Sequence, residues 1–136
     1  MAGFNLKSIT QTLSAEVPIR DTDGNPTGVT FEMAGPEHPE RKRLQFAQSR
    51  RALARYQKTG RVELPDPEEA ESLRFENLAA YTLGWKGYAD DAGSPVPFSR
   101  QAALDLYQDP SMAWLVDQLE AALGEKDLFI RRCASA

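Results

Sequence analysis

The stretch AEVPIRDTDGNPTGVTFEMAG, residues 15–35, decides the fold class of this chain. Apolar side chains alternate with polar neighbours on both sides of its centre, at Val17, Ile19, Val29, Phe31 and Met33. This period of two is typical of half-buried strands. Between them, DTDGNPTG gathers Asp, Gly, Asn and Pro, which accept or enforce turn dihedrals. The stretch predicts a β-hairpin over 15–34, and we expect it to pack on helices or extend a partner's sheet, because a bare hairpin is marginally stable.

Two long helices are predicted after the hairpin. A basic segment predicts the first, from about Pro39 to Lys58, with Thr59-Gly60 ending it. The second opens with a capping box, in which Asp66 is the N-cap and Glu69 the reciprocal acid. The spacing typical of a buried helical face then occurs at Phe75, Leu78, Ala79 and Thr82.

Two shorter helices complete the predicted architecture. Ser99 is the expected cap of a helix over 100–108, and Asp109-Pro110 restarts the chain for another over 111–124. We therefore expect an α+β fold, with an N-terminal β-hairpin followed by a bundle of three to four α-helices. The chain is expected to form a single domain over 1–136, in which 1–14 is a loose N-terminal arm or short edge strand and 36–131 the helical part.

Large aromatic side chains concentrate around the Gly- and Pro-rich loop over 84–99. They are Trp85, Tyr88, Phe98, Tyr107 and Trp114. Aromatic residues of this size are usually packed in a core, and they are also the anchors that recognition surfaces use. Trp85 and Phe98 lie on either side of the loop, and we expect them to clamp it.

Composition indicates an ordinary cytoplasmic protein domain. Hydrophobic residues make up 41% and charged residues 26% of 136, which argues against wholesale disorder. The N-terminus lacks the pattern of a signal peptide, and no apolar run approaches the roughly 20 residues of a membrane-spanning helix. The single cysteine, Cys133, leaves no disulfide to form within the chain and suits a reducing cytoplasm.

Residues for catalysis or metal binding are scarce. With one His and one Cys, a zinc site of paired ligands cannot be assembled. A calcium loop fails in register, because placing Gly24 at its obligatory glycine puts Ile19 and Thr30 where carboxylates belong. His38, the only imidazole, precedes a predicted helix and is expected to act as a cap or surface residue. We expect no enzymatic activity, no metal and no cofactor.

Charge is distributed unevenly along the chain. The formal net charge is −4, yet residues 41–61 contain eight basic side chains and no acidic one. Removing these eight from the sixteen basic residues leaves eight against twenty acidic ones, a charge of −12. A dense basic helix is typical of nucleic-acid surfaces. The following segment, 63–76, has six acids against one base, so the two helices are also expected to neutralise one another.

Helix register predicts which cations would be neutralised. The acids lie mainly in the first turns of the second helix, within reach of Arg55, Lys58 and Arg61. Arg41, Lys42 and Arg43, at the far end of the basic helix, are expected to stay unpaired and to contact an acidic partner. That partner is expected to be a protein, and nucleic acid is the less favoured alternative.

Three segments resemble tail assembly chaperones of long-tailed bacteriophages, small proteins encoded beside the tape-measure gene. These segments are FEMAGPEHPERK (31–42), TLGWKGY (82–88) and PFSRQAALDLYQDPSMAWLVDQL (97–119). The resemblance spans about residues 15–130 and rests on a Gly-Trp pair, a Pro-Phe-Ser helix start and a later helix tryptophan. It implies a largely helical, non-enzymatic protein that coats the tape-measure protein before the tail tube polymerises around it.

Several functions remain open on sequence alone. The tape-measure chaperone comes first, with possible self-association. A structural tail or head-tail connector subunit, and a small nucleic-acid-binding protein that uses the helix over 41–61, are the alternatives. The candidate partner-binding residues are Arg41, Lys42, Arg43, Arg50, Arg51, Trp85, Tyr88, Phe98 and Trp114.

Overall fold

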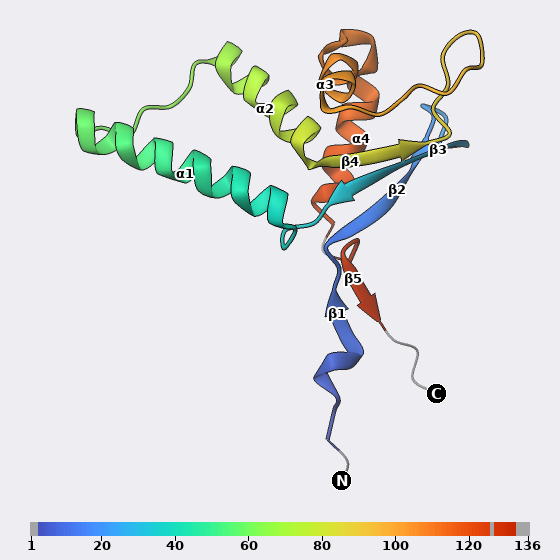
Figure 1. Ribbon diagram of the computed structural model, residues 1–136, viewed down its shortest axis with the longest axis horizontal. Helices are drawn as coiled ribbons and strands as arrows, with labels where there is room; N and C mark the ends of the chain where they lie inside the picture. The colour runs from blue at the N-terminus through green and yellow to red at the C-terminus, as the bar shows by residue number, and fades with distance from the viewer. Residues whose placement is uncertain (1–2, 126, 133–136) are drawn as a thin grey trace.

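A three-stranded antiparallel sheet occupies the centre of the molecule (Figure 1). The computed structural model describes residues 3–125 and 127–132. The sheet has the order β2-β3-β4 and comprises β2 (Ser14–Arg20), β3 (Pro26–Ala34) and β4 (Thr82–Lys86). Its strands β2 and β3 confirm the predicted hairpin. The fold is α+β, as expected.

The hairpin turn is built by Asp21. Its Oδ1 accepts hydrogen bonds from the backbone N–H groups of Asp23 and Asn25, both at 2.9 Å. Gly24 supplies the left-handed conformation, with φ of 86°, which costs a glycine little because it has no Cβ. The Asp21 carboxylate thus stabilises the turn by hydrogen bonds to the backbone of the turn itself.

Long helix α1 (Pro39–Thr59) begins and ends where its caps predict. The Nδ1 atom of His38 accepts a hydrogen bond from the Glu40 N–H at 3.1 Å, which confirms the expected capping role. Gly60 adopts the left-handed conformation and its N–H donates to the Tyr56 carbonyl, an ending that favours glycine.

The second long helix, α2 (Pro67–Tyr81), runs directly into β4. Asp66 caps it as predicted, by accepting the Glu69 N–H at 2.8 Å. The helical spacing was expected to continue through Thr82, but the backbone of Thr82 is extended. Thr82–Lys86 pairs with β3 instead, with Trp85 opposite Phe31. The segment over 36–131 is therefore not helical throughout.

Helices α3 (Arg100–Gln108) and α4 (Ala113–Leu123) pack with α2 against the inner face of the sheet, and a short 3₁₀ turn, η2 (Pro110–Met112), joins them. Ser99 caps α3 and Asp109 caps η2, as their sequences predict. The largest fully buried side chains are Tyr107, Phe31, Met33, Leu119 and Val116. The core thus lies between the hairpin and the three helices α2, α3 and α4.

A second, two-stranded sheet holds the two ends of the described chain together. After a 3₁₀ turn, η1 (Leu6–Ser8), strand β1 (Ile9–Gln11) pairs antiparallel with β5 (Ile130–Arg132). Of the two alternatives expected for residues 1–14, a loose segment or a short edge strand, the strand is therefore present over Ile9–Gln11, and a partner over 100 residues away supplies its hydrogen bonds. Cys133 lies outside the described residues.

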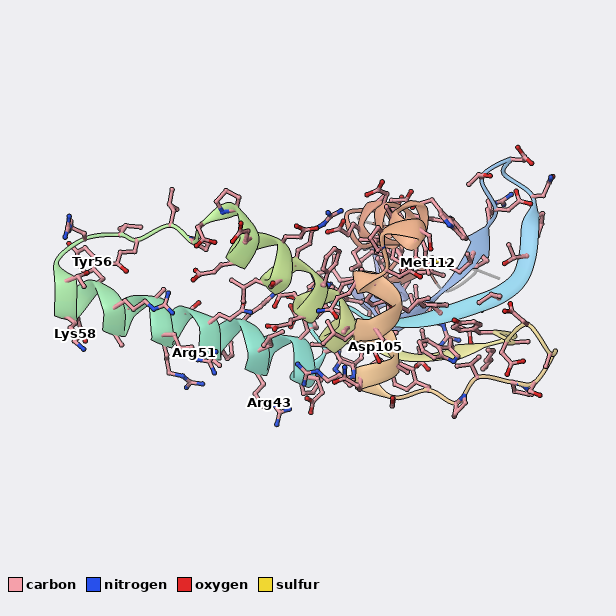
Figure 2. The ribbon with its side chains drawn as sticks, turned by 90° about the horizontal axis from the view of Figure 1, so that it is seen from above. Arg43, Arg51, Tyr56, Lys58, Asp105 and Met112 are labelled. Carbon is pink, nitrogen blue, oxygen red and sulfur yellow. The ribbon has the colours of Figure 1, made fainter. Side chains whose placement is uncertain are left out.

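Helices α1 and α2 extend away from the sheet and diverge toward their connection (Figure 1). We call residues 39–81, which comprise α1, the connection and α2, the arm. The remainder, which contains the three-stranded sheet, α3 and α4, is the body. In both views the arm stands clear of the body over most of its length (Figures 1 and 2).

Candidate functional site

Most of the arm lacks contact with any core. Every residue from 49 to 74 is exposed, and α1 buries none of its 21 residues. Only the C-terminal part of α2 joins the core, through Leu78 and Ala79. A helix usually gains most of its stability from packing an apolar face. An arm of this length without such packing leaves most of its helical surface open to solvent.

Large apolar side chains on the arm are exposed. Phe46 and Leu53 are 58% and 56% exposed, and Val62 and Leu64 in the connection reach 79% and 86%. Single exposed apolar residues are common on soluble proteins, but a cluster of them marks an interaction surface. The arm is therefore the principal candidate functional site.

Phe46 and Leu53 lie on the outer face of α1. They are seven residues apart, and Arg43 and Arg50 lie three or four residues from one or the other, so all four share one helical face. None of the four lines the groove between α1 and α2. Arg43 points away from α2 in Figure 2. We call these four residues the outer stripe.

The opposite face of α1 borders a groove of about 830 Å³ between α1 and α2. At its inner end, Gln48 Nε2 donates to Asn77 Oδ1 at 2.7 Å. Beyond this bond the helices separate, and Tyr56 lies on the side of α1 toward the connection (Figure 2). Apolar lining comes from Ala52, Tyr56, Val62, Pro65 and Leu73.

The two walls of the groove carry opposite charge. On α1 the charged lining residues are Arg51 and Arg55. The wall formed by the connection and α2 is acidic, with Glu63, Asp66, Glu68, Glu69 and Glu76. Among the described residues, none of these acids forms an ion pair with an α1 cation. The expected neutralisation of Arg55, Lys58 and Arg61 by the second helix is therefore wrong, because the helices diverge where those charges lie.

The first turn of α1 is also paired differently from the prediction. Lys42 forms an ion pair with Glu37, and Arg43 with Glu40. Both acids precede or open the helix, so they reach these cations locally. Arg41 Nη1 donates to the Ala34 carbonyl at 3.2 Å, and its guanidinium lies 4.6 Å from the centre of the Tyr81 ring. The three cations expected to be free are thus engaged within the chain.

The free cations are instead in the middle and at the end of α1. Within the described ranges 3–125 and 127–132, Arg50, Arg51, Arg55, Lys58 and Arg61 form no ion pair. Of the predicted site residues on this helix, Arg50 and Arg51 are therefore the available ones, and consecutive helical residues point about 100° apart. Arg50 belongs to the outer stripe, and Arg51 lines the groove.

Arg74 fixes the inner half of α2 to α4. Its Nε donates to the two carboxylate oxygens of Glu120 at 2.8 and 2.9 Å, and its Nη2 lies 3.2 Å from Asp117 Oδ1. These hydrogen bonds, chiefly the one to Glu120, raise the pKa of Arg74 above its usual value. The only base of the acidic segment thus pairs with α4, which leaves the acids of α2 without a cation of their own.

The aromatic residues of the body form a packed cluster around the loop over 87–99, which follows β4; residues 84–86, expected in this loop, belong to the strand. Ring centroids of Trp85 lie 4.9 Å from Phe98, 5.2 Å from Tyr88 and 5.4 Å from Phe31. The indole Nε1 of Trp85 donates to the Val96 carbonyl at 2.9 Å. Trp85 and Phe98 therefore clamp the loop, as predicted.

Trp114 lies apart from that ring cluster and lines a small apolar cavity of about 160 Å³. Tyr88 and Phe31 line the same cavity from the sheet side, and Met112 and Leu106 from the helices. The cavity lining is almost entirely hydrocarbon. Its size is that of one large apolar side chain, well below the volume of a typical ligand pocket.

Two other kinds of site are absent from the described residues. No group of three or more His, Cys, Asp or Glu side chains among them is arranged to hold a metal ion. No helix in the described part of the chain is long and apolar enough to cross a membrane.

It was not predicted from the sequence that the acidic wall and the connection between α1 and α2 form part of a site. The apolar pair Val62 and Leu64, which flanks Glu63 in a segment between helices, was a usable signal. The exposure of Leu73 could not be predicted, because a leucine that flanks a buried helical face is expected to be buried in the core.

Comparisons with known proteins gave no relative: no protein-family model, no curated protein and no solved structure matches this chain.

Proposed function

We propose that this protein is a tail assembly chaperone of a long-tailed bacteriophage, which binds the tape-measure protein in the host cytoplasm during tail morphogenesis. The observation that carries the proposal is the arm, whose apolar side chains are exposed on a helical scaffold. A protein that keeps a long helical client soluble needs exposed apolar anchors and does not need an active site. The three segments that resemble the chaperone family supply the identity of the client.

The outer stripe suits an amphipathic helix of the client. Phe46 and Leu53 lie two helical turns apart, which matches the spacing of anchors on a partner helix packed along α1. Arg43 and Arg50 flank them, and Arg50 forms no ion pair within the described residues. Acidic side chains beside the client's apolar stripe would therefore be favoured.

Co-expression tests this proposal. The chain is produced together with the tape-measure protein encoded beside it, and the soluble fraction of that protein is measured. We expect wild type to keep the client soluble and the F46S/L53S variant to lose that effect, because the substitution removes both anchors. The Q45S variant is the control, since Gln45 is an exposed residue of α1 that lies off the outer stripe, and its replacement should leave the effect unchanged.

Three results would count against the proposal. The first is no complex and no gain in client solubility with wild type. The second is equal solubilisation by wild type and F46S/L53S, which would show that the outer stripe does not bind the client. The third is retention of the chain on duplex DNA with a steep inverse dependence on salt, together with no effect on the client, which would favour the nucleic-acid alternative.

A further inference from the structure

The groove between α1 and α2 is shaped for a helical occupant. It is open along the arm, holds about 830 Å³ and is bordered by two helices that meet only at its inner end. Tyr56, Val62 and Leu73 line it and remain exposed. Burial of such side chains contributes about 25 cal/mol for each Å² removed from water. An occupant that covers them would therefore gain affinity mainly from apolar contact.

Charge restricts which helices fit. The α1 wall presents the cations Arg51 and Arg55, and the facing wall presents five acids. None of these seven groups forms an ion pair within the described ranges. An occupant must therefore present acids to α1 and bases to α2. A helix of one charge sign would be repelled by one of the two walls.

The arm itself meets this requirement. Its helix α1 belongs to the segment with eight bases and no acid, and α2 to the segment with six acids and one base. When two arms are related by a two-fold axis, the α1 of each copy can lie against the α2 of the other. Such an interface is self-complementary, as a two-fold dimer requires. Two helical hairpins packed in this way form a four-helix bundle.

We propose that the protein self-associates through its arms, with the α1 of each copy seated against the acidic α2 wall of the other. Apolar contact among Tyr56, Val62 and Leu73 supplies the affinity, and the opposite charges fix the register. Exposed ion pairs add little affinity each, but like charges placed face to face oppose association. This inference holds whatever client the protein binds, because the outer stripe lies on the other face of α1.

Charge reversal on one wall at a time tests the pairing. The R51E/R55E variant makes both walls acidic, and the E68K/E69K/E76K variant makes both walls basic, because three lysines then outnumber the two remaining acids of the α2 wall. In sedimentation equilibrium of the full chain, we expect wild type to approach twice the monomer mass at low salt. Each variant should raise the dimer dissociation constant by roughly tenfold or more. High salt should weaken the wild-type dimer, because it screens the exposed charges.

Mixing the two variants is the decisive step. In the mixed dimer, the acidic α1 of R51E/R55E faces the basic α2 of E68K/E69K/E76K, and the basic α1 of the second faces the acidic α2 of the first. We therefore expect the mixture to recover a dimer that neither variant forms alone. Recovery also shows that both variants are folded, and circular dichroism of each confirms their helical content. The single variants R50E and R51E are a matched pair, since only Arg51 lines the groove, and R50E should dimerise as wild type does.

Each other outcome overturns the proposal. If wild type stays monomeric at high concentration, the groove is not a self-association site, and a different partner such as a client helix would occupy it. Two folded variants that remain monomeric when mixed show that charge pairing between the walls of two copies does not form the dimer. Equal weakening by R50E and R51E places the contact outside the groove.

Discussion

Thr82 joins three elements through one hydroxyl group. It is buried, and its Oγ1 donates to the Leu78 carbonyl at 2.8 Å. The same oxygen lies 2.6 Å from the hydroxyl of Tyr107, which is therefore the donor of that bond. Thr82 thus ends α2, begins β4 and receives a bond from α3. The helical spacing predicted that this residue is buried, but it did not indicate that the hydroxyl links the helix to the strand.

Alkaline stability is expected to depend on Tyr107. Burial raises the pKa of its hydroxyl well above the usual value, so the folded state keeps the group neutral at pH values where the unfolded chain, with a tyrosine pKa of about 10, ionises. Its contribution to the free energy of unfolding is therefore fully present below about pH 10 and is lost as pH rises further. Urea unfolding of wild type should show a falling midpoint in this range.

The Y107F variant provides the control for that prediction. It removes the ionisable group and one hydrogen bond, which costs about 1 kcal/mol at neutral pH. Its midpoint should then fall less steeply than that of wild type above about pH 10. Parallel curves for the two proteins would show that other groups govern alkaline unfolding.

At the scale of elements, local signals predicted helix ends well and pairing partners poorly. His38, Asp66 and Ser99 each accept the backbone N–H that their position in the sequence predicts, because a cap involves only three or four neighbouring residues. Strand β4 was missed because its five residues gain their conformation from β3, about 50 residues away. The charge pairing of the arm was wrong because it depends on the angle between α1 and α2, which no local pattern encodes.

Strands β3 and β4 approach closely at a pair of glycines. Gly87 has φ of 79°, and a Cβ at this position would lie 2.5 Å from the Gly28 carbonyl oxygen. Gly24 has a similar φ of 86° with open space around it. In thermal unfolding, G24A should cost about 1 kcal/mol from backbone strain alone, and G87A should cost about 1–3 kcal/mol more because the backbone must also move.

The comparison between the two variants separates strain from contact. Equal losses in G24A and G87A would show that β4 can shift away from β3 without cost. A larger loss in G87A would show that the edge strand is held tightly, which matters because β4 carries Trp85 into the aromatic cluster.

At the scale of the whole molecule, stability and recognition are divided between two parts. The body contains the core, and the arm contributes exposed charge and exposed apolar side chains. The hairpin and the helices of the body follow from patterns that the sequence displays, since alternation and helical spacing both report burial, whereas β4 does not. The open groove does not, because the same apolar residues of α1 and α2 would suit a closed helical hairpin equally well.

Hydrogen exchange is expected to report this division. In dilute solution, where any dimer has dissociated, amides of 49–66 should exchange well before those of β3 and α4, because every residue of that segment is exposed. At high concentration the same amides should become protected if the arms pair. Equal protection of arm and body in dilute solution would contradict the description of the arm as a separate, weakly held part.

The pairing of β1 with β5 has a mechanical consequence. Both described ends of the chain leave from the same end of this ribbon (Figure 1), with the Ile9–Arg132 pair outermost and the Gln11–Ile130 pair innermost. A force that pulls the ends apart therefore acts in the unzipping geometry. It breaks the hydrogen bonds of the ribbon one residue pair at a time and does not load all of them together, as shearing would. Tension applied at the ends would be relieved there first, at low force, before any load reached the three-stranded sheet.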